Sequence, residues 1–188
     1  MPTIFSHAIL ASALGGAFQS GQPTKLSGRF WILTAICAIV PDLDVVGFAF
    51  QIQYGDMFGH RGLTHSLSFA LLVGLITPYI FFSAEHVLRR KLIIYFAAVT
   101  FTHPLLDMLT NGGLGVALLA PFGNERFFSA WRPIEVSPIG SDFFSERGIY
   151  VLISEIAWIW LPSLVIAFMA MLVWRKRMKT QPADISRT

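Results

Sequence analysis

Five stretches of apolar residues alternate with shorter polar stretches along the chain. They cover residues 4–18, 30–50, 63–82, 92–109 and 150–174. A helix needs about 20 apolar residues to cross a bilayer, so the last four stretches are long enough and the first is short. The pattern therefore predicts an all-α fold, a polytopic transmembrane helical bundle with about five membrane segments.

The first stretch carries a small residue at every fourth position, namely Ala8, Ser12 and Gly16. Small side chains allow two helices to approach closely inside a membrane. We therefore expect the other segments to enclose this short helix.

The composition agrees with a membrane protein. Hydrophobic residues make up 54% of the 188 residues and charged residues 13%, whereas soluble domains have about 25% charged residues. The net charge of +3 is too small to indicate a nucleic-acid partner, and none is expected. The single cysteine, Cys37, lies inside an apolar stretch, which favours a packing role in the core.

Residues 1–174 are expected to form one membrane-embedded domain, followed by a basic tail at 175–188. Residues 110–149 form a connection that is long for a linker, which suggests a functional cap. Cytoplasmic loops are rich in Lys and Arg, and ten of the 14 such residues fall in residues 19–29, 83–91 and the tail. This distribution predicts a cytoplasmic tail, with the N-terminus and the 110–149 connection outside.

By the same counting of crossings, seven residues that can bind metal ions lie on the outer side of the membrane. They are His7, Asp42, Asp44, His60, His65, His103 and Asp107. Each could alone be an ordinary packing or hydrogen-bonding residue. Ionisable residues in membrane segments are costly, however, and are candidates for function. Their gathering on one side predicts a metal site at the outer leaflet.

The spacing of these residues suits coordination. His103 and Asp107 are four residues apart and share a helix face. Pro41, in the sequence PDLD, is expected to break the second helix, and an unwound turn there would bring Asp42 and Asp44 together.

Imidazole and carboxylate groups without thiolates favour zinc, with manganese and iron left open. The seven candidates exceed the ligands of one catalytic zinc, so one or two ions are expected. Some candidates could instead orient a ligand. His60 and His65 flank Gly62, which suits a loop that leads into a helix with Thr64 as its N-cap.

Two further residues are candidates for substrate binding or catalysis. Arg61 lies next to the predicted metal ligands and could bind a phosphate group with both arms of its guanidinium. Alternatively, Arg61 pairs with an aspartate, either Asp42, Asp44 or Asp56. Glu155 could be a ligand, a general base or the partner of an outer arginine.

Four motifs resemble, in order and spacing, the YdjM-type inner-membrane proteins, known as membrane-bound metal-dependent hydrolases. They are PDLD, FGHRGLTHS, HPLLDMLTNGG and LLAPFGNERF. The resemblance covers roughly residues 7–127. It implies a hydrolase of the bacterial inner membrane with a bound divalent metal.

The order of these residues is also similar to that of the zinc phospholipase C and S1/P1 nuclease superfamily. That similarity implies metal ligands at His7, one PDLD aspartate, His60 or His65, and His103 with Asp107. It also implies that Asp107 bridges two metals. Those enzymes use further histidines downstream, whereas none follows His103 here, so one or two ions are expected rather than three.

The expected function is hydrolysis of a phosphoester in a lipid or lipid-linked substrate at the periplasmic leaflet, and the phosphoester comes from the superfamily resemblance. The metal would activate water, and Arg61 with Arg126 would hold the anionic group. Two alternatives are a metal-ion transporter and a regulatory interaction protein with a structural metal. The oligomeric state is left open.

Overall fold

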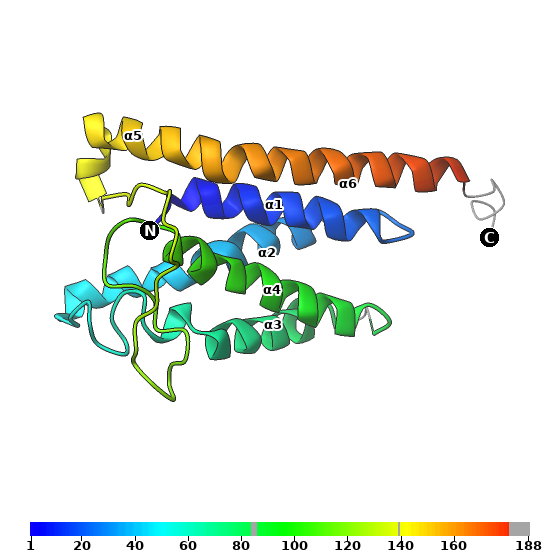
Figure 1. Cartoon of the computed structure of the whole chain (residues 1–188). Coiled ribbons are helices and arrows are strands. Elements are labelled where there is room, and N and C mark those ends of the chain that lie inside the picture. Colours follow the sequence, from blue (N-terminus) through cyan, green and yellow to red (C-terminus); the bar gives the residue numbers. More distant parts are fainter. Residues whose placement is uncertain (84–85, 139, 181–188) are drawn as a thin grey trace.

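The computed structural model describes residues 1–83, 86–138 and 140–180, which form a helical bundle (Figure 1). The α-helices are α1 (Ile4–Ser20), α2 (Gly28–Ile39), α3 (Leu67–Phe81), α4 (Arg89–Met108), α5 (Glu146–Glu155) and α6 (Leu161–Thr180). The 3-10 helices η1 (Val40–Phe50), η2 (Leu63–His65) and η3 (Gly140–Phe144) and the π-helix η4 (Ile156–Trp160) complete the set. Within the described residues only two isolated β-bridges occur, and the all-α prediction is confirmed.

Two helical stretches are long and apolar enough to cross a membrane. They are Gly28–Phe50, which joins α2 to η1, and Glu146–Thr180, which joins α5, η4 and α6. The helices α1 and α3 are shorter, with 17 and 15 residues, and α4 begins with three basic residues. Helix length and hydropathy therefore support two of the five predicted membrane segments.

Small residues set the closest helix contacts. The helix α1 packs against α2, α4 and α6, so the expectation that other helices enclose it is confirmed (Figure 1). A side chain at Gly16 would begin 4.0 Å from the Ala170 Cβ of α6, and one at Gly74 of α3 would overlap Ala97 of α4. Close approach of this kind is how membrane helices gain packing energy.

Apolar side chains fill the centre of the bundle between α1, α2 and α4. Phe30, Leu92, Phe96 and Val99 are at most 1% exposed. Cys37 belongs to the same core, is 3% exposed and forms no disulfide. Its predicted packing role is confirmed.

The two ends of the bundle differ in content (Figure 1). One end holds the N-terminus, η1, the start of α3 and the connection after α4, and the opposite end holds the turns between α1 and α2 and between α3 and α4. The tail predicted at 175–188 begins as the last turns of α6, which runs to Thr180. Its remainder, residues 181–188 with Arg187, lies outside the described residues.

Candidate metal centre

Asp42 and Asp44 lie just after the point where the α-helix α2 changes into the 3-10 helix η1. The α-helix α2 ends at Ile39, and a 3-10 helix with Pro41 in its first turn follows. The predicted break at Pro41 is therefore confirmed. The tighter 3-10 turn does not bring Asp42 and Asp44 together at one point. Instead they approach His65 from two sides, with Asp42 Oδ1 3.5 Å from Nε2 and Asp44 Oδ2 3.1 Å from Nδ1.

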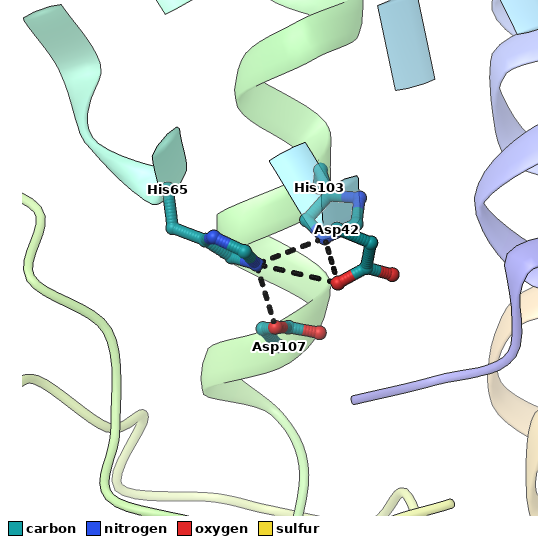
Figure 2. A group of neighbouring side chains, drawn as sticks. All are labelled: Asp42, His65, His103 and Asp107. Atoms are coloured by element: carbon teal, nitrogen blue, oxygen red, sulfur yellow. Dashed lines mark hydrogen bonds and ion pairs between the residues drawn. The ribbon is translucent and has the colours of Figure 1, made fainter. Parts of the chain in front are cut away.

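Four buried side chains converge at the end of the bundle that holds the N-terminus (Figure 2). They are Asp42, His65, His103 and Asp107, here called the Asp42 group, and one donor atom of each lies within 4.8 Å of the others. Three of them are 0% exposed and Asp42 is 6% exposed. His103 and Asp107 project from successive turns of α4, as their spacing predicts.

The donor atoms are spaced as the corners of a coordination shell. His103 Nε2 lies 3.1 Å from His65 Nε2 and 3.2 Å from Asp42 Oδ1, and His65 Nε2 lies 3.4 Å from Asp107 Oδ2. A tetrahedral ion with bonds of about 2.0–2.1 Å separates its donors by about 3.3–3.4 Å. The observed spacings fall on either side of that value.

The tautomers of the two histidines aim lone pairs at each other. His103 Nδ1 lies 2.7 Å from the Ala38 carbonyl oxygen, which can only accept, so Nδ1 carries the proton. His65 Nδ1 likewise faces the Asp44 carboxylate. In the neutral rings both Nε2 atoms are then acceptors, 3.1 Å apart, and two acceptors at that distance repel unless a metal ion or a proton lies between them.

The carboxylates of the Asp42 group lack hydrogen-bond donors. Both oxygens of Asp42 and both of Asp107 are buried without such a partner, although Arg61 Nε forms an ion pair with Asp107 Oδ2 at 3.1 Å. If His65 and His103 are neutral, as metal-bound imidazoles are, the charges of Asp42, Asp44 and Asp107 exceed that of Arg61 by two. Buried charges of this kind require a counter-ion, and a divalent cation would balance them. The residues therefore fit the predicted metal.

The second cluster, Asp44 with His60 and His65, is here called the Asp44 group. Asp44 Oδ1 accepts from His60 Nδ1 at 2.7 Å. Its Oδ2 accepts from the Thr64 hydroxyl at 2.6 Å and from the Arg61 backbone N–H at 3.1 Å, beside His65 Nδ1. Both oxygens are thus fully used inside the protein. Asp44 orients His65, and the donor atoms of the Asp44 group also lie close enough together to hold a metal ion, so one or two ions stay a prediction.

His7 lies beside the centre without joining the four converging donors. Its ring stacks on His103 with centroids 3.7 Å apart, and its Nε2 is 3.8 Å from Asp107 Oδ1. Both ring nitrogens are buried without a hydrogen-bond partner. His7 therefore covers the side of the centre that faces α1, where its Nε2 lies near the Oδ1 atom of Asp107.

The position of Arg61 differs from the predicted one. Its guanidinium pairs with Asp107 and donates to the Thr110 hydroxyl and to the Gly112 carbonyl oxygen, both at 3.1 Å. A side chain at Gly113 (φ 87°) would begin 2.8 Å from Nη1. Arg61 is 0% exposed and itself has a positive φ of 62°. It is therefore committed to Asp107, not to Asp42, Asp44 or Asp56, and the predicted bidentate grip on phosphate has no geometric support.

Arg126 braces the loop before the metal ligands. Its guanidinium donates to the carbonyl oxygens of Tyr54, Asp56 and His60 at 2.9–3.2 Å. Burial lowers the pKa of Arg126 from its usual value, and burial raises the pKa of the Tyr54 phenol. An arginine keeps its positive charge at neutral pH. The predicted role in holding an anion is replaced by contacts to backbone oxygens.

Glu155 holds the start of α1 rather than a metal or an arginine. Its carboxylate accepts from the Thr3 backbone N–H, from the Thr3 hydroxyl at 2.6 Å and from the Ser6 hydroxyl at 2.7 Å. The first turn of α1 has no side-chain cap of its own, so a carboxylate from α5 satisfies its donors. Glu155 thereby fixes the helix that carries His7.

Two local features escaped prediction from the pattern. Ser66, not Thr64, caps α3 by accepting from the Phe69 N–H at 3.0 Å, so the predicted Thr64 cap is wrong. The partners of Arg61 at Thr110 and Gly112 lie in the sequence TNGG, directly after α4. The paired glycines there were a visible signal of close backbone approach.

The fold and the site together define an all-helical protein with a buried His/Asp centre at one end of the bundle. The chain matches the family described as YdjM inner membrane protein over residues 1–180. It is 39% identical over 181 residues to "Inner membrane protein YbcI" of Escherichia coli (strain K12), with 94% of this chain and 100% of that protein covered. The chain therefore belongs to the YdjM inner membrane protein family. No solved structure matches it.

Proposed function

We propose that this protein is a membrane-bound metal-dependent hydrolase whose Asp42 group holds one divalent ion, with zinc preferred over manganese. The observation that carries the proposal is the convergence of two imidazole lone pairs and two carboxylates that lack donors. An apolar protein interior holds such a set only when a metal ion or bound protons compensate its charge.

The donor set favours catalysis over a purely structural metal. Structural zinc sites rely mostly on cysteine thiolates, whereas catalytic zinc is held by histidines and carboxylates. Because the Asp42 group already offers four protein donors, water or substrate would have to enter as a fifth ligand or in place of one of them. A bound divalent ion would supply Lewis acidity and an acidified water. Within the protein, Asp44 and the Ala38 carbonyl hold the two imidazoles in the required tautomer, and Arg61 orients Asp107.

The proposed substrate is a phosphoester in a lipid or lipid-linked molecule. Two things support this choice: membership of an inner-membrane family and the order of His and Asp residues shared with zinc phospholipases. Arginines are not part of this proposal, because Arg61 and Arg126 are used by protein oxygens.

We further propose five membrane crossings, with the metal centre on the periplasmic side and residues 175–180 in the cytoplasm. The support is the distribution of basic residues and its agreement with the two ends of the bundle (Figure 1). Cysteine-accessibility labelling of intact cells at position 130 and at position 178 tests the orientation. Labelling of position 178 but not of position 130 would show the opposite orientation in the membrane.

Elemental analysis of the purified protein, combined with assays on lipid phosphoesters, tests the function. One ion per chain is expected, and His103→Ala should lose both the metal and hydrolysis. His86→Ala is the matched control, because His86 is exposed and lies between α3 and α4, at the end of the bundle opposite the centre (Figure 1). Wild-type protein without metal, or His103→Ala with full metal content, would refute the proposed centre.

A second candidate function, a regulatory membrane protein with a structural metal, is favoured by burial. The four residues of the Asp42 group are at most 6% exposed. This candidate predicts a metal that chelators remove only when the protein unfolds, and no hydrolysis of any phosphoester. A transporter is less well supported, because Phe30, Phe96 and Val99 fill the core on the path away from the centre.

A further inference from the structure

We propose that a groove between α3 and the connection after α4 holds the hydrocarbon chain of a membrane lipid, with the lipid head group directed towards the metal centre. This inference rests on the proposed function and names the part of the substrate that the protein recognises away from the metal. No residue of the Asp42 group or the Asp44 group lines the groove.

The groove has a volume of about 440 Å³, within the range of small-molecule sites. Its walls are formed by Leu67, Leu71, Leu118, Leu119, Phe122 and Gly123. Ser68 and Glu125 add polar atoms at its rim. Such a lining suits an alkyl chain, which needs apolar contact and no hydrogen bonds.

One end of the groove opens on the apolar face of α3. Leu67, Leu71 and Leu75 lie four residues apart on this face and are 44%, 56% and 47% exposed. The spacing makes them one continuous stripe along the helix. In a membrane protein an exposed stripe of this kind faces lipid, so a chain can enter the groove sideways from the bilayer.

Hydrogen bonds join the walls of the groove to the metal-bearing loop. Leu67 follows His65 by two residues, and its N–H donates to the Leu118 carbonyl oxygen at 3.1 Å. The Ala117 N–H donates to the Arg61 carbonyl oxygen at 2.9 Å. Both walls are thus attached to the segment that supplies His65, and a chain in the groove would bring its head group to that segment.

Gly123 offers a way to fill the groove. A side chain at this position would meet no atom within 4 Å, and Gly123 has an ordinary backbone conformation. Gly123→Trp should therefore fold and occupy the space of the chain. Gly28 at the start of α2 is equally open and lies at the opposite end of the bundle, so Gly28→Trp is the matched control.

The test is photo-crosslinking of full-length protein in phosphatidylethanolamine and phosphatidylglycerol vesicles. The vesicles carry a trace of phosphatidylcholine with a diazirine near the carboxyl end of one acyl chain. Labelled peptides are located by mass spectrometry. We expect labelling at 67–71 and 118–123 above that of the outward face of α6. Gly123→Trp should lose this labelling, and Gly28→Trp should keep it.

Equal labelling of Gly123→Trp and Gly28→Trp, or labelling of the groove no stronger than that of α6, would overturn the proposal. A variant that fails to fold is recognised by its metal content and melting curve, and Gly123→Leu then takes its place. The result is independent of turnover. Labelled grooves in a protein without hydrolysis would refute the proposed function alone, and a metal-loaded hydrolase without groove labelling would refute the groove alone.

Discussion

The two carboxylates of the PDLD turn, two residues apart on one 3-10 helix, are in opposite states. Asp44 receives hydrogen bonds at both oxygens, from His60, Thr64 and the backbone of Arg61. Asp42 is equally hidden from solvent and receives none at either oxygen. Hydrogen bonds at both oxygens hold Asp44 in place, whereas a buried carboxylate without donors is destabilising unless a cation lies beside it or it takes up a proton.

His65 connects these two environments. Its Nδ1 faces the satisfied Asp44, and its Nε2 faces the unsatisfied Asp42 and Asp107. The contact with Asp44 sets the tautomer and the ring orientation of His65, and Nε2 is the atom that would bind the metal ion. This is the division between an orienting partner and a ligand that metal sites commonly use. Each prediction below alters a carboxylate on one side of His65, the arginine that pairs with Asp107, or a distant carboxylate.

The largest effect is expected for Asp107→Ala. The substitution removes a ligand and leaves the buried Arg61 guanidinium without its ion-pair partner. Loss of one member of a buried pair costs about 3–5 kcal/mol. Metal content should fall close to zero and the melting temperature in detergent should drop sharply. Asp142→Ala, at an exposed position, is the control and should change neither value.

Asp42→Asn should separate metal binding from folding. The metal should be lost, but in the presence of a chelator the variant should be at least as stable as the wild type, because an unpaired buried charge has been removed. Thermal unfolding without chelator measures the stabilisation by the metal, and thermal unfolding with chelator measures the stability of the metal-free protein. If the chelated variant is clearly less stable than the chelated wild type, Asp42 has a partner that the proposed centre does not include.

Asp44→Asn should weaken metal binding without abolishing it. An amide cannot accept all the hydrogen bonds that Asp44 now accepts, so His65 would lose its fixed orientation. Loss of such an orienting partner typically lowers metal affinity by about 10–100-fold. A competition titration against a chelating dye measures the affinity, and excess metal should restore full occupancy. Complete loss of the metal at saturating concentration would make Asp44 a ligand instead.

Part of this arrangement could be predicted from the sequence. The apolar stretches predicted the helices, Pro41 marked the break between α2 and η1, and the four-residue spacing placed His103 and Asp107 on one helix face. These are local properties, set by the geometry of a single helix. Helix length and hydropathy support two of the five predicted membrane segments, because α1 is short, as its apolar run already indicated, and α3 has 15 residues where the run 63–82 has 20.

The division between Asp42 and Asp44 could not be predicted in the same way. It depends on which donors the loop 60–65 brings to each carboxylate after folding. The roles of Arg61 and Glu155 could not be predicted for the same reason. Their partners, Thr110 and Thr3, are 49 and 152 positions away in the sequence. No spacing rule reaches that far, and a charged residue near a site has several possible partners until the chain is folded.

Arg61→Lys should have a moderate effect on folding and a small one on the metal. A lysine keeps the positive charge near Asp107 but cannot also donate in the fixed directions of Thr110 and Gly112. One or two buried acceptors would lose their donor, at about 1–3 kcal/mol each. Metal content should stay near one ion per chain while the melting temperature falls. Loss of metal together with normal stability would contradict this assignment.

The smallest effect on the metal is expected for Glu155→Gln, which also tests why Asp44 matters. Glu155, like Asp44, is a buried carboxylate whose oxygens are satisfied by hydrogen bonds, but its donors are Thr3 and Ser6, and none of them is a metal ligand. Glutamine would keep some of these bonds, so the expected loss is about 1 kcal/mol of stability, with metal affinity unchanged. If a satisfied carboxylate acts only through the groups that it orients, Asp44→Asn must shift metal affinity and Glu155→Gln must not. Equal shifts in the two variants would mean that both act by loosening the bundle as a whole, and the contact between Asp44 and His65 would then have no special role.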